Sequence, residues 1–230
     1  ALTGNGTNRT IPHRVMIDEA SVLLSSRMIA FLMEPRRAEA DALADLADAL
    51  ELAASVFKAR GGDGNLKQAQ RLAISANDCR KGKQPRANGV AAKLLGTLSV
   101  LRTHGFTGEP KRDWIEARRF LRESGANPLQ EIAQEAEQLI VFQRGHRIAA
   151  GFTELWQTQG HYKGARTALD MALAEDQLLS GGNDLRGIHV MTVHKAKGKE
   201  FDAVIIFDDP NSSPLLFNKE AAPHPKCRKL

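Results

Sequence analysis

The sequence predicts a mostly helical α/β protein, in which a long helical region interrupts a partial parallel sheet. Apolar residues recur at three- and four-residue spacing through most of residues 37–182, a pattern typical of amphipathic helices. The flanking regions instead carry short apolar stretches of the extended type, near residues 11–17 and 188–207. Because neither flank has enough strands for a stable sheet by itself, we expect both flanks to contribute to one sheet.

The first expected elements are an extended segment over residues 11–17 and a helix over residues 20–32. Pro35 follows the helix and closes it, since proline donates no backbone hydrogen bond. Asp18 and Glu19 resemble a carboxylate pair of the Walker B type. The sequence contains no Gly-x-x-x-x-Gly-Lys-Ser/Thr loop to hold phosphates, so we interpret the pair as acidic residues at a helix N-terminus.

The middle of the chain is expected to be helical, with glycine, proline and asparagine in the connectors marking the turns. Asp113 is predicted to cap the helix that begins at Trp114. Both tryptophans, Trp114 and Trp156, lie on apolar helical faces and are expected in the core. The expected helices cover residues 43–57, 66–79, 90–101, 114–121, 128–142, 146–157 and 163–179.

Two strands are expected after the helical region, over residues 188–193 and 203–207. The second reads Ala-Val-Ile-Ile-Phe, a continuous apolar run typical of a strand buried on both faces of a parallel sheet. The predicted fold class is therefore α/β, with the sheet split by a helical insertion.

Composition restricts the partners and the compartment. The 230 residues carry a net charge of +5, a mild preference for polyanions. Two basic clusters, one at Arg118, Arg119 and Arg122 and one at residues 80–86, either contact phosphates or form solvated basic faces. We expect Cys79 and the second cysteine, at position 227, to be free thiols. Free thiols are usual in a reducing compartment, so the cysteines favour a cytoplasmic protein. The sequence has no apolar run of about 20 residues, so no membrane span is expected.

Residues 192–202 join the two expected strands, at the place where open α/β sheets bind ligands. The Thr192 hydroxyl, the His194 imidazole and the Lys195 ammonium group are suitable donors to phosphates. Gly198 lets the backbone approach a ligand closely, and the Glu200 carboxylate can accept a hydrogen bond from a sugar hydroxyl. The alternative is a solvated, lysine-rich turn.

The order Thr-x-His-x-x-Lys-Gly-x-Glu-Phe over residues 192–201 resembles motif V of the UvrD-like superfamily 1 DNA helicases, although Lys199 stands where the family more often has leucine. The resemblance implies that residues 1–36 and 186–230 form part of a second, RecA-like motor domain. Residues 37–185 would then be its inserted helical subdomain. Since the chain has no initiator methionine and no motif VI, it is expected to be an internal fragment.

The same resemblance implies roles for the loop. Thr192 and His194 would face the backbone of single-stranded DNA, with Lys195 beside them, whereas Gly198 and Glu200 would lie on the nucleotide side. The implied parent is an ATP-dependent DNA helicase that moves three-prime to five-prime, uses ATP and Mg²⁺, and binds single-stranded and duplex DNA together with the remaining helicase domains.

The chain alone is expected to be inactive, because it has neither a Walker A loop nor the arginines of motif VI. No catalytic residue and no metal site are predicted. His224 and Cys227 are two possible zinc ligands, whereas zinc sites generally use three or four. The alternative function is a non-catalytic module that binds nucleic acid, or a protein partner through its helical region.

Overall fold

The computed structural model describes residues 13–16, 20–138, 146–180, 188–191, 196 and 200–205. The chain divides into two compact units. One unit comprises residues 18–184 and is helical, and the other comprises residues 1–17 together with residues 185–230.

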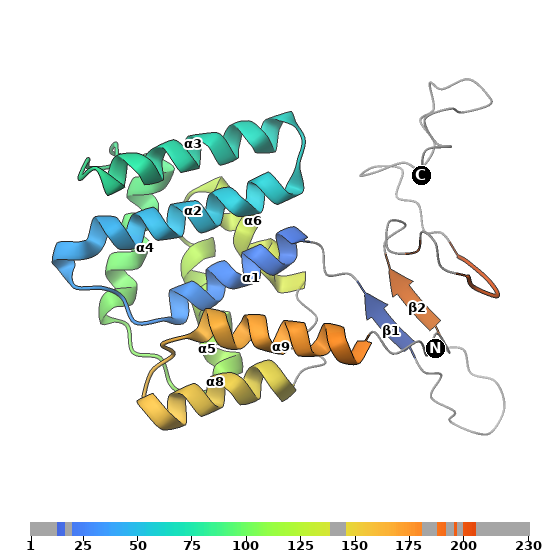
Figure 1. Ribbon diagram of the computed structural model, residues 1–230. Helices are drawn as coiled ribbons and strands as arrows, with labels where there is room; N and C mark the ends of the chain where they lie inside the picture. The colour runs from blue at the N-terminus through green and yellow to red at the C-terminus, as the bar shows by residue number, and fades with distance from the viewer. Residues whose placement is uncertain are drawn as a thin grey trace, which may run out of the picture. The chain divides into compact units, whose positions relative to one another are not determined.

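The helical unit is a bundle in which α1 contacts α2, α5, α6 and α9, while α2 packs against α3 along most of its length (Figure 1). Two short 3-10 helices, Glu39–Asp41 and Ala136–Gln138, adjoin α2 and α6. The α-helices are α1 (Ala20–Met33), α2 (Ala42–Arg60), α3 (Asp63–Arg80), α4 (Val90–Thr103), α5 (Pro110–Arg122), α6 (Asn127–Glu135), α8 (His146–Gln159) and α9 (Ala165–Ser180).

Helix α1 lies at the centre of this bundle. It is apolar on nearly all sides, and Met28, Ile29 and Leu32 are fully buried. A helix that is apolar all round is stable only when other helices cover every side, and here four helices do so. This helix was expected to belong with the N-terminal extended segment, whereas the structure packs it into the helical unit.

Helix α5 begins earlier than predicted, at Pro110, because proline at the first helical position has a suitable φ and no N–H to satisfy. Asp113 is therefore inside the helix, and the prediction that it caps the start of the helix is wrong. Its buried carboxylate accepts hydrogen bonds from Thr107 N (2.9 Å), Thr107 Oγ1 (2.8 Å), Gly108 N (2.8 Å) and the Tyr162 hydroxyl (2.7 Å). The side chain holds the α4–α5 loop and the segment before α9 together.

The other unit contains two short strands, β1 (His13–Met16) and β2 (Ile188–Met191). They pair in parallel, with His13 opposite Ile188 and Met16 opposite Met191. Strand β2 lies within the strand expected at residues 188–193, and β1 lies within the extended segment expected at residues 11–17.

The predicted fold class is wrong, because the described structure is a helical bundle and not an α/β fold with a partial RecA-like sheet. Its β-structure is limited to the four-residue strands β1 and β2. The expected strand over residues 203–207 is not seen: residues 203–205 are irregular, and residues 206 and 207 lie outside the described part. A strand needs a neighbouring strand to satisfy its backbone hydrogen bonds. Among the residues that the structure describes, no strand pairs with residues 203–205.

No helix within the described ranges is both long enough and apolar enough to span a membrane.

Candidate nucleic-acid interface

The structure leaves most of the predicted site outside its described residues. Thr192, His194, Lys195 and Gly198 fall in the part that is not described, so their predicted roles remain predictions. Glu200 is described and exposed, at the start of the irregular segment 200–205. An exposed carboxylate is accessible to a ligand hydroxyl. The predicted role of Glu200 requires this accessibility but is not tested by it.

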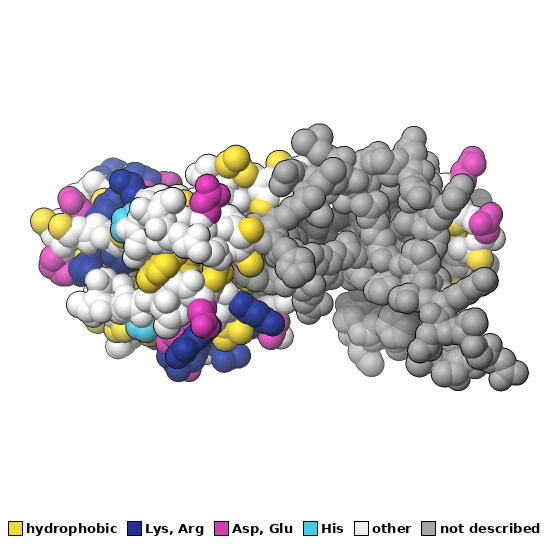
Figure 2. Space-filling view, turned by 90° about the horizontal axis from the view of Figure 1, so that it is seen from below, with side chains coloured by type: hydrophobic (Ala, Val, Ile, Leu, Met, Phe, Trp, Pro, Cys, Tyr) yellow, Lys and Arg dark blue, Asp and Glu magenta, His cyan; other side chains and the backbone are white. Residues whose placement is uncertain are grey.

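The basic cluster on α5 is largely neutralised by nearby carboxylates. Arg118 forms an ion pair with Glu137 at 3.1 Å, and Arg119 forms one with Glu116 at 2.7 Å. Arg122 is exposed and has no ion pair within the described residues. Basic and acidic side chains are also interspersed on the face of the helical unit seen in Figure 2. The α5 cluster is therefore not a continuous basic surface.

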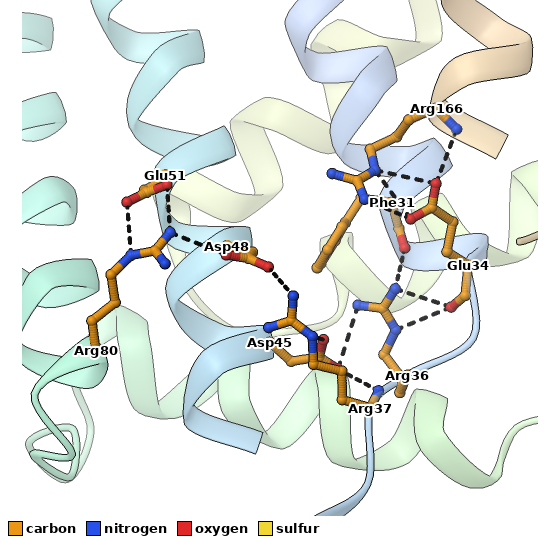
Figure 3. Close-up of polar contacts among 9 residues, drawn as sticks. All are labelled: Phe31, Glu34, Arg36, Arg37, Asp45, Asp48, Glu51, Arg80 and Arg166. Carbon is orange, nitrogen blue, oxygen red and sulfur yellow. Dashed lines mark hydrogen bonds and ion pairs between the residues drawn. The ribbon is translucent and has the colours of Figure 1, made fainter. Parts of the chain in front are cut away.

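In the second basic cluster, Arg80 has a structural role (Figure 3). Its guanidinium group donates to both oxygens of Glu51, at 3.1 and 2.8 Å, and to Asp48 at 3.1 Å. The hydrogen bonds to Glu51 raise the pKa of Arg80 above its ordinary value. Because Glu51 and Asp48 belong to α2, this arginine ties the end of α3 to its neighbour.

The rest of the second cluster surrounds one carboxylate. Lys83 lies 2.8 Å from Asp78, and its hydrogen bond lowers the pKa of that carboxyl, with smaller contributions from the charges of Lys81 and Arg86. Lys81 and Arg86 themselves are exposed and form no ion pair among the described residues. Three cationic side chains therefore act on the single Asp78 carboxylate.

A charged network that was not predicted from the sequence surrounds the connection between α1 and α2 (Figure 3). Arg36 is almost completely buried, with its guanidinium group 4.1 Å from the centre of the Phe31 ring and hydrogen bonds to the carbonyl oxygens of Phe31 and Glu34. Burial lowers its pKa. The Glu34 carboxylate binds Arg166 of α9 at 2.8 Å. The only sequence signal was a pair of arginines directly after Pro35.

The same network also engages the carboxylates of α2. Arg37 forms an ion pair with Asp48 at 2.7 Å, and its backbone N–H donates to Asp45 at 3.0 Å. Together with the contacts of Arg80, these interactions engage Asp45, Asp48 and Glu51, which are all the acidic residues of α2.

The described ranges contain no group of three or more His, Cys, Asp or Glu side chains arranged to hold a metal ion. His224 and Cys227 lie outside those ranges.

Comparison with protein families matches residues 187–220 to the UvrD-like helicase C-terminal domain. This segment resembles that domain. The matched residues include the whole of the 192–201 motif, so the resemblance found in the sequence is supported at the level of the family. A helicase domain of this kind suggests nucleic acid, in general terms, as a partner. Searches of curated proteins and of solved structures found no match.

Proposed function

We propose that this chain is part of an ATP-dependent DNA helicase of the UvrD-like type, which moves three-prime to five-prime along a single strand. The observation that carries the proposal is the family match over residues 187–220, because it covers the one motif in the chain whose residue types suit both DNA and nucleotide.

In this proposal the 192–201 loop has two sides. Thr192, His194 and Lys195 donate hydrogen bonds to the phosphates of single-stranded DNA, which orients the strand without reading its sequence. Gly198 allows the backbone close to the nucleotide, and the Glu200 carboxylate accepts a hydrogen bond from the ribose. When bound to the complete helicase, ATP with Mg²⁺ supplies the phosphoryl transfer that drives movement. Since one short loop contacts both ligands, a shift on one side is transmitted to the other.

The helical unit favours a second candidate function, a non-catalytic module that binds a protein or nucleic acid. Among the described residues, its core contains many side chains of its own helices, such as Leu46, Leu98 and Leu129, which are almost fully excluded from solvent. A bundle with such a core can serve as a binding surface whether or not the adjoining segment takes part in ATP hydrolysis.

Two substitutions, made in a helicase that contains this chain, test the two sides of the loop. Glu200→Ala should raise the ATP concentration needed for half-maximal hydrolysis, whereas His194→Ala should leave hydrolysis without DNA intact and abolish most of its stimulation by single-stranded DNA. Asp202→Asn, at an exposed carboxylate two residues from Glu200, is the matched control and should change neither. Steady-state hydrolysis with and without oligonucleotide measures both effects.

The chain by itself provides a further check. Because its sequence has no Walker A loop, the purified 230-residue chain should not hydrolyse ATP above a protein-free blank. Hydrolysis by the isolated chain would contradict the proposed function. Unchanged DNA stimulation in the His194 variant, together with an unchanged ATP requirement in the Glu200 variant, would also contradict it.

A further inference from the structure

Residues 81–89 connect α3 to α4 at one end of the helical unit (Figure 1). The last part of this connection, residues 86–89, is a reverse turn in which the Gly89 N–H donates to the Arg86 carbonyl oxygen at 3.1 Å. Helix α4 begins at the next residue, Val90. The turn therefore leads directly into the first turn of a helix.

Asn88 is the third residue of this turn and adopts a left-handed conformation, with a φ of 62°. Among the described residues it is the only one besides glycine with a positive φ, which the third residue of a type II turn requires. Its side chain is exposed, and its amide has no hydrogen-bond partner within the described residues. The side-chain amide of Asn65, in contrast, donates to the Gly61 carbonyl oxygen at 2.8 Å. The Asn88 carboxamide is therefore accessible to water and able to rotate.

The residue that follows Asn88 has little space for a side chain. A Cβ on Gly89 would lie 3.2 Å from the Arg86 carbonyl oxygen, closer than an ordinary van der Waals contact. Because glycine has no Cβ, other groups can approach its backbone nitrogen closely. The Gly89 nitrogen is a nucleophile, and the carbonyl carbon of the Asn88 side chain is an electrophile. These two atoms are close enough along the chain to close a small ring.

We infer that Asn88 is a site of spontaneous deamidation. The Gly89 nitrogen loses its proton and bonds to the side-chain carbon, Cγ, of Asn88, which closes a succinimide ring. The bond from Cγ to the side-chain nitrogen breaks, and that nitrogen leaves with the proton as ammonia. Water then opens the ring at either carbonyl group and leaves aspartate or isoaspartate. Water is the only co-reactant, and the reaction does not depend on the function proposed for the 192–201 loop.

The turn slows this reaction in the folded chain. A nitrogen that has lost its proton cannot donate to the Arg86 oxygen, so the hydrogen bond between Gly89 and Arg86 must open before the ring closes. The net strength of one such hydrogen bond corresponds to a slowing of roughly twofold to tenfold relative to the unfolded chain. The rate at Asn88 therefore depends on how often the turn opens.

Deamidation alters the beginning of α4. This helix has no acidic residue in its first turn and no side-chain hydrogen bond from its N-cap, Gly89. Aspartate at position 88 adds one negative charge beside the N-cap, where the helix dipole favours it, and lowers the net charge of the chain from +5 to +4. Isoaspartate instead lengthens the backbone by one carbon atom and disrupts the turn. The two products therefore have opposite effects on α4.

The test follows the 230-residue chain during incubation at mildly alkaline pH, in buffer and in urea. Trypsin at mildly acidic pH then releases residues 87–93, in which Asn88 is the only asparagine. Mass spectrometry should show this peptide gaining the mass difference between a carboxylic acid and an amide, as two species that chromatography separates. Conversion should be roughly twofold to tenfold faster in urea than in buffer. A sample taken at time zero corrects for conversion during digestion.

Two other asparagines are internal controls. Asn77 is exposed within α3 and is followed by Asp78, so it should remain intact in the folded chain over the same period. Asn5 is the other asparagine followed by glycine. In urea it should convert at a rate similar to that of Asn88, because the local sequence alone then determines the rate.

Gly89→Ala tests the attacking nitrogen directly. The added Cβ obstructs the close approach, so conversion at Asn88 should slow roughly tenfold or more, and it should do so in urea as well, where folding has no influence. Gly96→Ala is the matched control, because a Cβ at this position in α4 meets no atom within 4 Å, and it should leave the rate unchanged.

Three results would overturn the inference. The first is a peptide 87–93 that stays unmodified in the folded chain while Asn5 converts in urea. The second is conversion of Asn77 in the folded chain at the rate of Asn88, and the third is an equal rate in the Gly89 and Gly96 variants. None of these results bears on the 192–201 loop, so this inference and the proposed helicase function can fail independently.

Discussion

The two units differ in how well an apolar sequence pattern predicts burial. In the helical unit, Leu50 and Phe57 follow a helical spacing and are 0% and 2% exposed. In the other unit, the apolar run that begins at Ala203 was expected to be a buried strand, yet Ile205 is 97% exposed. A helix satisfies its backbone hydrogen bonds within one segment, whereas a strand depends on partners elsewhere in the chain. Local patterns therefore located the helices and the strands β1 and β2, but they were insufficient at residues 203–205, which pair with no strand among the described residues.

The largest expected effect tests the helical side of this comparison. Phe57→Ala should lower the free energy of unfolding by about 3–5 kcal/mol, because it removes a buried ring and leaves a cavity in the core. Ile74→Ala, on the adjacent helix α3 but 55% exposed, is the control and should change stability by less than about 1 kcal/mol. Urea denaturation followed by circular dichroism measures both. Similar losses in the free energy of unfolding for the two variants would show that the apolar sequence pattern does not predict burial in this bundle.

The helices were predicted well because their signals are local. The helix expected over residues 90–101 is α4, Val90–Thr103, and the helix expected over residues 146–157 is α8, His146–Gln159. Asp113 was misinterpreted because the helix begins at Pro110 and not at Trp114. One of its hydrogen-bond partners, Tyr162, is also 49 residues away and cannot be paired with it from spacing alone. The chemistry of the 192–201 loop was predictable as residue types, but its geometry depends on contacts that a linear pattern does not contain.

A smaller effect is expected at Tyr162, which joins two parts of the helical unit through Asp113. Burial raises the pKa of Tyr162 well above its ordinary value, and the hydrogen bond to the Asp113 carboxylate adds to this because ionisation would place two anions side by side. A raised pKa in the folded state means that the stabilisation is complete below the unfolded value of about 10 and is lost as the pH rises above it.

Tyr162→Phe should therefore cost about 1–3 kcal/mol near neutral pH, and the difference from the unchanged chain should shrink above about pH 10. Urea denaturation of both chains at several pH values measures it. Because the chain has a single tyrosine, near-ultraviolet absorbance of tyrosinate reports this residue alone. Ionisation of the folded chain at the pH of a free tyrosine, or a difference that does not depend on pH, would contradict the buried Tyr162–Asp113 contact.

The smallest effect is expected at Ile205, where an apolar pattern is not accompanied by burial. With 97% of its surface exposed, its side chain is already hydrated in the folded chain, so replacing it with serine removes almost no favourable transfer free energy. Ile205→Ser should change the free energy of unfolding by less than about 0.5 kcal/mol. Leu50→Ala, at a fully buried position, is the positive control and should cost about 2–5 kcal/mol in the same urea titration. A loss above about 1 kcal/mol at Ile205 would mean that the side chain is buried in solution, and the contrast between the two units would then not hold.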